Sequence, residues 1–207
     1  MILLKFLWGK TVLIAIFFSF SIESQSKNII FNKTHCVAWK TKKRMFLTHF
    51  LEPIGINCSI KAQFKKEDSG FYIEVSAPIK NFDSKEPKRD KEIIKILKAN
   101  IQPTLIIRTK SYPLEEWKND WRSNKFKNKI TIEIGKKRFP LIVKVQKYEE
   151  RQSFILRGKV VTSFSHLSLS PPSLAWGLIT KVSDYLELHY NLDVLKIDGF
   201  KKVIDNN

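Results

Sequence analysis

Glycine is scarce in this sequence, with only seven residues in 207. Glycine-rich loops are the usual cradles for phosphate groups, because they let the backbone come close to the ligand. Neither the P-loop pattern nor G-x-G-x-x-G occurs in the chain. The shortage of glycine therefore argues against a nucleotide-binding enzyme, and we expect no cofactor.

Motifs for metal binding and nucleophilic catalysis are also missing. The four histidines, His35, His49, His166 and His189, show neither H-x-H nor H-E-x-x-H spacing, which favours surface histidines over metal ligands. Serines are frequent between 163 and 173, but no G-x-S-x-G motif presents one as a nucleophile. We predict no catalytic residue and no metal site; a hydrolase whose site is assembled from distant strands is the weaker alternative.

One apolar run stands out, at the N-terminus. Residues 11–22 are mostly apolar, with Lys5 and Lys10 before them and the small or polar residues 23–26 after them. The run is shorter than the ~20 residues that a membrane-spanning helix needs. We therefore predict a secretory signal peptide over residues 1–26 and a mature domain over 27–207 that is periplasmic or secreted. An uncleaved N-terminal anchor is the alternative.

Acidic residues are few beside basic ones. The chain has 37 Lys and Arg against 20 Asp and Glu, a net charge of +17, which attracts anionic partners but says nothing about the fold. We expect no nucleic-acid partner, because the chain is predicted to be exported. The lysine-rich segments 40–44 and 136–138, which we predict to be turns, either dock the protein on an anionic membrane surface or keep strand edges soluble. The scattered positions of the charges favour solubility.

Cysteine occurs only twice, as Cys36 and Cys58. An oxidising compartment favours pairing of two cysteines, and a hairpin that turns near Leu47 places positions 36 and 58 opposite each other. Strict alternation argues against the pair: with Val37 and Trp39 on the inner face, Cys36 points outward while Cys58 points inward. A bulge reconciles the two, so a disulfide and two buried thiols remain equal alternatives.

Alternation of apolar and polar side chains dominates the chain from residue 37 to residue 192. It is clearest over 54–64, which we predict to be one uninterrupted strand. The pattern predicts about eight strands, and a sheet with one apolar face must pack against another layer or close on itself. Because little helix is predicted to cover the sheet, we expect a mainly β, antiparallel, roughly eight-stranded barrel whose interior holds a small ligand. A β-sandwich is the alternative.

Residues 81–109 combine a loop, a helix and a strand. The polar stretch 81–88, which contains Pro87, indicates a turn. Apolar residues at helical spacing then predict a short helix near 90–98, with Asp90 as its N-cap. After Pro103, alternation over 104–109 predicts a strand.

The order of these motifs resembles the YceI-like lipid/polyisoprenoid-binding family. The steps Phe82-Asp83-Ser84, Arg89-Asp90 and Pro103-Thr104-Leu105 occur in the family's order around its helix, although Leu97-Lys98-Ala99-Asn100 stands where the family has a Phe-Phe-Asp step. Residues 129–143, 164–173 and 182–186 resemble the family's hairpin, its late strand and loop, and its final strand entry. The likeness covers roughly residues 37–192. It implies a lipocalin-like barrel of the bacterial periplasm that encloses a long isoprenoid chain.

The resemblance also implies an apolar lining for the barrel. The candidate lining residues are Trp39, Ile60, Phe64, Phe71, Ile73, Phe82, Leu97, Leu105, Ile107, Phe164 and Trp176. On sequence alone, core filling is the better explanation for any single aromatic residue among them, and the resemblance shifts the balance toward a ligand lining. The helix near 90–98 and the loop 171–180 cover an opening, either as a movable gate or as a fixed plug.

These observations predict an exported, non-catalytic protein that carries an isoprenoid-type or other fatty, long-chain lipid. Burying such a cargo gains about 0.8 kcal/mol per CH2 group, and this term needs no directed contacts. The alternative is a cargo-free barrel that acts through its basic surface on anionic envelope components. Nothing in the sequence predicts an oligomeric state.

Overall fold

The computed structural model describes residues 29–45, 49–150, 152–172 and 180–205, so the predicted signal peptide lies outside the described residues. Within them one sheet of eleven strands is accompanied by a few short helices, which confirms the prediction of a mainly β chain. The strands are β1 (Cys36–Met45), β2 (His49–Leu51), β3 (Ile54–Asn57), β4 (Lys61–Glu67), β5 (Gly70–Pro78), β6 (Thr104–Thr109), β7 (Lys125–Ile134), β8 (Lys137–Glu150), β9 (Ser153–Thr162), β10 (Thr180–Asp193) and β11 (Ile197–Asp198). The helices are α1 (Pro87–Ile96), α2 (Leu114–Arg122) and α3 (Phe200–Asp205), with single 3-10 turns η1 (Ile79–Asn81) and η2 (Val194–Lys196). No helix in the described part of the chain has the length and apolar character needed to cross a membrane.

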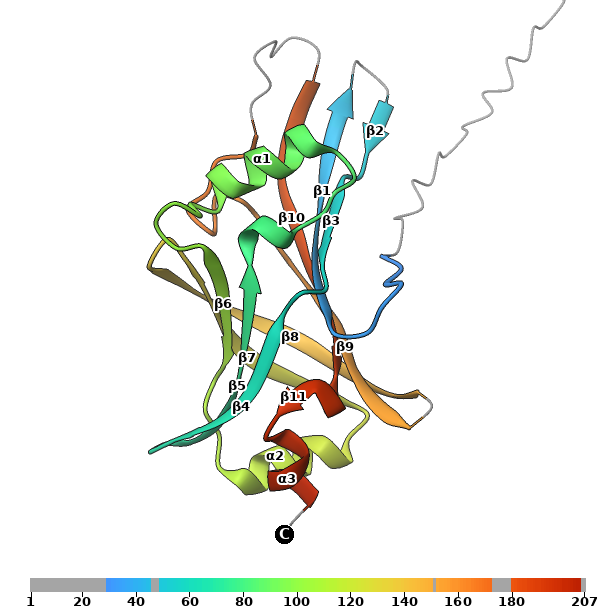
Figure 1. Ribbon diagram of the computed structural model, residues 1–207, viewed down its shortest axis with the longest axis vertical. Coiled ribbons are helices and arrows are strands. Elements are labelled where there is room, and N and C mark those ends of the chain that lie inside the picture. The colour runs from blue at the N-terminus through green and yellow to red at the C-terminus, as the bar shows by residue number, and fades with distance from the viewer. Residues whose placement is uncertain (1–28, 46–48, 151, 173–179, 206–207) are drawn as a thin grey trace, which may run out of the picture.

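The strand order is β11-β4-β5-β6-β7-β8-β9-β10-β1-β2, and neighbours are antiparallel except for the parallel pair β11 and β4. The sheet does not close on itself along this path, so the predicted eight-stranded barrel is not confirmed. Beside the path, β3 pairs with β1. Only residues 58–60 separate β3 from β4, so one length of chain connects strands near the two ends of the order (Figure 1).

The core lies on the inner face of the curled sheet. Across β4 and β5, Ala62 lies opposite Val75 and Phe64 lies opposite Ile73, and all four side chains are buried. β-Branched and aromatic residues facing each other across strands in this way stabilise a sheet.

Helices lie at both ends of the curled sheet (Figure 1). At the end away from α1, the aromatic rings of Trp117 on α2 and Phe200 on α3 contact Phe64, with centroid distances of 5.3 and 5.1 Å. The indole N–H of Trp117 donates a hydrogen bond to the carbonyl of Phe71 (2.8 Å), which satisfies the polar atom of this buried residue. Neither α2 nor α3 was predicted from the sequence.

The predicted strand over 54–64 is wrong, because the chain breaks after Asn57. The Asn57 side chain accepts a hydrogen bond from the Ser59 backbone N–H (2.8 Å) and donates one to the Pro78 carbonyl (2.9 Å). An Asn side chain that bonds the backbone two residues on makes a local turn in competition with the strand ladder. The alternation of buried residues shifts by one position across this break. The buried residues are odd-numbered in β3 (Gly55 and Asn57) and even-numbered in β4 (Ala62 and Phe64).

This change of phase places the two cysteines on one side of the sheet. Val37 lies opposite Asn57 in the β1–β3 pair, so Cys36 points to the outer face, and Cys58, just after β3, lies beside it. A disulfide joins Cys36 to Cys58. The interpretation that Cys58 points inward was wrong, since it assumed alternation without a break.

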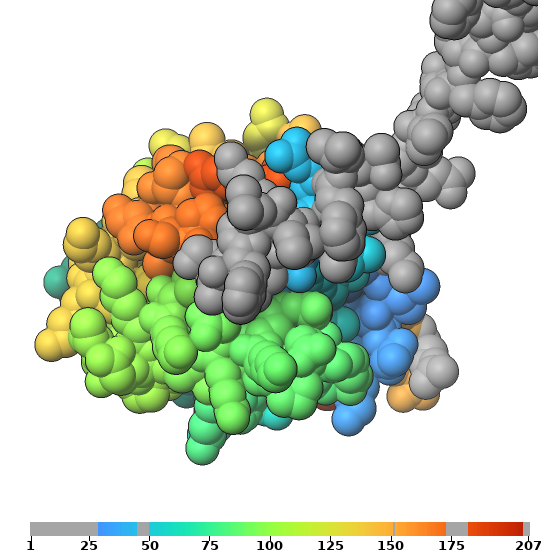
Figure 2. All heavy atoms as spheres, turned by 90° about the horizontal axis from the view of Figure 1, so that it is seen from above, coloured from blue at the N-terminus to red at the C-terminus, as the bar shows by residue number. Residues whose placement is uncertain are grey.

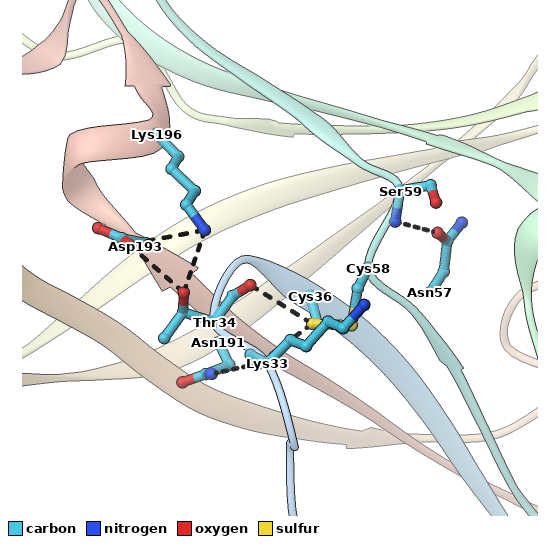
Figure 3. The surroundings of a disulfide bond; sticks show 9 residues. All are labelled: Lys33, Thr34, Cys36, Asn57, Cys58, Ser59, Asn191, Asp193 and Lys196. Atoms are coloured by element: carbon cyan, nitrogen blue, oxygen red, sulfur yellow. Dashed lines mark hydrogen bonds and ion pairs between the residues drawn. A yellow bond between two sulfur atoms is a disulfide. The ribbon is translucent and has the colours of Figure 1, made fainter.

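Polar contacts next to the disulfide hold the segment before β1 (Figure 3). The Asn191 side-chain amide donates to the Lys33 carbonyl (3.3 Å), and the Thr34 hydroxyl donates to the Asp193 carboxylate (3.4 Å). These contacts fix the position of Lys33 beside β10.

Helix α1 begins three residues earlier than predicted, and Asp90 is not its cap. Glu86 is the N-cap residue, and its side chain accepts a hydrogen bond from the Lys88 backbone N–H. Pro87 occupies the first turn, where its missing N–H costs nothing. Asp90 instead accepts hydrogen bonds from the backbone N–H (3.0 Å) and the hydroxyl (2.6 Å) of Ser84, which ties the preceding loop to the helix.

Candidate functional site

An apolar cavity of about 70 Å³ lies between the inner face of the sheet and α1. Residues of β1, β6, β7 and β10 form its wall, and α1 together with residues 164–169 forms its cover. Viewed from this end of the molecule, the segment that carries α1 (green) and the segment around 160–172 (orange) make up much of the visible surface (Figure 2). We call this space the inner cavity.

The cover consists of apolar side chains on short, polar-flanked segments. Ile93 and Ile96 on α1, and Leu97 just after it, face the inner cavity. Phe164 and Leu167 face it from the other segment. Lysines occupy the opposite side of α1, as the amphipathic spacing predicts.

The turn over residues 163–169 is held at one end of the cover by hydrogen bonds to Asp184. The backbone N–H of Ser165 donates to that carboxylate (2.9 Å), and the Ser165 hydroxyl donates to it as well. These hydrogen bonds lower the pKa of Asp184 below its ordinary value. The carboxylate therefore remains charged, and remains an acceptor for this turn, at neutral pH.

The predicted lining residues fall into two groups in the structure. Those that line the inner cavity are Trp39, Phe82, Leu97, Leu105, Ile107 and Phe164. Those that lie elsewhere in the core are Ile60, Phe64, Phe71 and Ile73, while Trp176 lies outside the described residues. Alternation identifies which face of a strand is inner, but it does not say how far along the sheet each residue lies.

Phe64 and Phe71 belong to the aromatic cluster at the far end of the sheet. Their rings stack with a centroid distance of 5.2 Å. Trp121 extends the cluster, with centroid distances of 5.2 Å to both Phe154 and Phe200. The cluster fills the end of the sheet that lies away from α1.

The inner cavity is small in this conformation. Its volume of about 70 Å³ is well below the ~300–1,000 Å³ of typical ligand pockets. A long hydrocarbon chain is larger than this space, so binding one there would require part of the cover to move outward.

One polar atom in the wall has no partner. Among the residues that the structure describes, the buried indole N–H of Trp39 meets no hydrogen-bond acceptor. The ring lies against Gly55 in the neighbouring strand β3. The rest of the wall is almost entirely hydrocarbon, which suits an apolar guest and offers little directional recognition.

A buried charge cluster lies on the outer face of β1 and β10. The ammonium group of Lys40 lies 3.2 Å from the Glu187 carboxylate and 3.6 Å from that of Glu52. His189 lies 2.7 Å from the same Glu187 carboxylate, which also accepts a hydrogen bond from the Tyr185 hydroxyl. The prediction that 40–44 is an exposed turn was therefore wrong, because these residues continue β1 and Lys40 is buried.

The cluster holds Glu187 in its charged form. Burial raises the pKa of Glu187, but hydrogen bonds from Tyr185, His189 and Lys40 outweigh burial and lower it to about 2. For His189, burial lowers the pKa and outweighs the raising effect of Glu187. A charged Glu187 carboxylate and a neutral His189 imidazole are thus the expected state at pH 7.

The described residues contain no group of three or more His, Cys, Asp or Glu placed to hold a metal ion. Of the histidines whose side chains the structure describes, His35 and His189 lie in separate polar environments, and His166 lies in the turn after β9.

Comparisons with known proteins show the fold. No protein-family model and no curated protein matches the sequence. Among solved structures, BcnA of Burkholderia cenocepacia is similar over 75% of this chain and 94% of its own, with 13% identity and a TM-score of 0.56. A polyisoprenoid binding domain from Saccharophagus degradans, implicated in plant cell wall breakdown, is similar over 77% of this chain and 97% of its own, with 6% identity and a TM-score of 0.54. The YCEI protein of Campylobacter jejuni aligns over 90% of this chain and 97% of its own, with 12% identity and a TM-score of 0.49. The likeness to the first two structures establishes a shared fold, and at that level the predicted YceI-like resemblance is confirmed.

Proposed function

We propose that this chain is an exported member of the YceI-like family that binds a long-chain, isoprenoid-type lipid in the inner cavity without catalysing a reaction. The observation that carries the proposal is the hydrocarbon wall between the sheet and α1, in a fold shared with a polyisoprenoid binding domain. Burial of an apolar chain there gains about 0.8 kcal/mol for each CH2 group.

The bound state requires the cover to open. Helix α1 spans only Pro87–Ile96, and short elements with few buried contacts open at a lower free energy than the core strands. Of its residues, Ile93 alone is fully buried. Outward movement of α1 exposes the wall formed by Leu105, Ile107 and Ile132, which the entering chain then covers.

We further propose that β3 and β4 act as one bent strand. Because β3 pairs with β1 and β4 pairs with β5, such a strand encloses the inner face as a roughly eight-stranded, lipocalin-like barrel. With a signal peptide over residues 1–26, the mature domain that forms this barrel covers residues 27–207. In this barrel the bend between the two strands lies at residues 58–60.

Two features support export to the periplasm or secretion. Residues 1–26 have the pattern of a signal peptide. The disulfide between Cys36 and Cys58 is of the kind that forms and persists in oxidising compartments.

A second candidate function is a cargo-free protein that acts through its basic surface on anionic envelope components. The small volume of the inner cavity, about 70 Å³, favours this candidate, since a long chain does not fit without movement of the cover.

Mass spectrometry of the purified protein separates the two candidates. Organic extraction of protein recovered from its native host is expected to release a prenyl or fatty molecule at close to one per chain. Protein stripped of lipid is then expected to bind a fluorescent prenyl alcohol. A folded protein that yields no lipid and binds no prenyl probe contradicts the carrier proposal and supports the surface-acting alternative.

A further inference from the structure

A second concave region lies on the outer side of β2 and β3. It has a volume of about 1150 Å³, and we call it the outer groove. Its apolar floor contains Phe50, Leu51, Ile54 and Ile56. Ile54 and Ile56 lie opposite Lys40 and Ala38 across the β1–β3 pair, on the face away from Trp39. Among the described residues, none lines both the outer groove and the inner cavity.

The floor of the outer groove exposes large apolar side chains at the edge of the sheet. Phe50 is 65% and Leu51 is 48% exposed, and both belong to β2, which ends the strand order. Natural edge strands are normally protected by charge or proline rather than by exposed aromatic residues. Two adjacent exposed apolar residues on an edge strand therefore indicate an interaction site.

Positive charge also lines the outer groove. Lys33, Lys42, Lys85 and Arg89 are among its lining residues. Within the described residues, Lys85 pairs with Asp83 (2.5 Å), whereas no carboxylate pairs with Lys33, Lys42 or Arg89.

The acidic groups of the outer groove are already engaged. The Glu52 carboxylate lies 3.6 Å from the buried ammonium of Lys40, and Asp83 is the partner of Lys85. The border of the outer groove therefore presents unneutralised positive charge to a partner.

Exposed apolar side chains together with Lys and Arg are the composition of a surface that binds the interface of a lipid bilayer. The apolar side chains enter the boundary between headgroups and acyl chains, and the cations bind anionic headgroups. We propose that the outer groove and the β2 edge dock the protein on a membrane that contains anionic phospholipid. This docking gives the carrier of the proposed function a place to exchange its cargo, but the docking itself does not depend on cargo.

The outer groove is physically linked to the cover of the inner cavity. Arg89 of α1 borders the outer groove, while Ile93 and Leu97, further along the same segment, face the inner cavity. Before the helix, Phe82 faces the inner cavity and Asp83 faces the outer groove. Asp83 exchanges two backbone hydrogen bonds with Ile56 (2.9 and 3.0 Å). A membrane bound at the groove thus contacts the same segment that must move to admit a lipid.

Vesicle co-sedimentation tests the proposal. The probe is phosphatidylcholine vesicles with or without phosphatidylglycerol, and the full chain is used so that residues 1–28 contribute equally in every variant. We expect binding only to the anionic vesicles. The double substitution K42E/R89E is expected to weaken binding by about tenfold or more, since each basic side chain near an anionic surface contributes to affinity. F50S/L51S is expected to weaken it by about tenfold through loss of apolar insertion.

Matched controls distinguish docking at the groove from general attraction. K201E/K202E makes the same change of charge on α3, at the other end of the molecule, and I142S/L195S removes two exposed apolar residues that do not line the groove. Both control variants are expected to bind as the wild type does. Equal losses in the groove and control variants, or no preference for anionic vesicles, overturn the proposal.

Two further measurements separate membrane docking from misfolding and from self-association. Circular dichroism of each variant checks that it is folded. If the wild type forms a dimer that F50S/L51S dissociates while vesicle binding is unchanged, the β2 edge binds a second copy of the chain and the proposal is wrong.

Vesicle binding without extractable lipid contradicts the carrier proposal alone, and extractable lipid without vesicle binding contradicts the docking proposal alone.

Discussion

The indole ring of Trp39 lies directly against the backbone of Gly55. A Cβ atom at position 55 would lie 2.4 Å from the Trp39 Nε1 atom and 2.5 Å from its neighbouring ring carbon. Because the two residues are opposite each other in the β1–β3 pair, glycine leaves the space that the ring occupies. The contact sets the position of a side chain that lines the inner cavity.

Gly55→Ala is expected to lower the free energy of unfolding by about 1–3 kcal/mol, because the added methyl group overpacks the contact with Trp39. Urea denaturation measures the loss. In a W39F background the smaller ring makes room for the methyl group, so the cost of Gly55→Ala should fall substantially. Equal costs in the two backgrounds would show that Trp39 is not the source of the strain.

Removal of the disulfide should destabilise the fold. Cys36 and Cys58 are 22 positions apart in the sequence, and a cross-link that closes a loop of this size contributes about 3 kcal/mol. C36S/C58S is expected to lose this amount in urea denaturation. Wild-type protein in reductant should match the double variant, and a thiol assay of the native protein should detect no free thiol; detection of two thiols contradicts the pairing.

Glu187→Gln is expected to cost about 3 kcal/mol at pH 7, since loss of one partner leaves the buried Lys40 poorly compensated. This figure is at the lower end of the usual range because Glu52 lies 3.6 Å from the same ammonium group. Glu150→Gln serves as the control. It breaks a half-exposed pair with Arg157, which typically contributes no more than about 1 kcal/mol.

The same carboxylate makes stability depend on pH. Folding lowers the pKa of Glu187 from its ordinary 4.5 to about 2, so the unfolded chain binds a proton at this residue more readily than the folded chain does. Its stabilising contribution is complete above pH 4.5 and is lost as the pH falls through that range toward 2. Denaturation midpoints measured across the interval should fall more steeply for the wild type than for Glu187→Gln; parallel curves would contradict the assignment.

Filling the inner cavity should block lipid binding. Leu105 is buried and lines the cavity, and Leu105→Trp is expected to abolish binding of a prenyl probe at a cost of about 1–3 kcal/mol in stability. Ile142→Trp is the control, because Ile142 is 61% exposed on β8. If the two variants bind the probe equally well, the lipid site lies elsewhere.

Periodicity predicted some elements well. The strand after Pro103 and the helix near 90–98 follow directly from apolar spacing. With Glu86 as N-cap and Pro87 in the first turn, that helix begins closer to the N-terminus than predicted. Helix α2 was missed despite a usable signal. Pro113 precedes its first turn, Glu115 and Glu116 lie in that turn, and Trp117 and Trp121 follow at i, i+4 spacing.

Other features could not be predicted from local patterns. The turn at Asn57 depends on a hydrogen bond to Pro78, which is 21 residues away in the sequence. Lys40 was predicted to lie in a turn. Its partner Glu187 lies on the neighbouring strand β10, which is far away in the sequence. Whether a residue such as Phe64 or Leu105 lines the inner cavity depends on its depth along the sheet, which strand alternation does not encode.

The aromatic cluster of Trp117, Trp121 and Phe200 fills the interior at the end away from α1. Under the proposed function, a lipid in the inner cavity therefore enters tail first and leaves head first, past α1. Its polar end would stay nearest the exit, where a receiving membrane or protein meets it before the hydrocarbon is released. A lipid longer than the available space would protrude past α1, because the aromatic cluster blocks the opposite end.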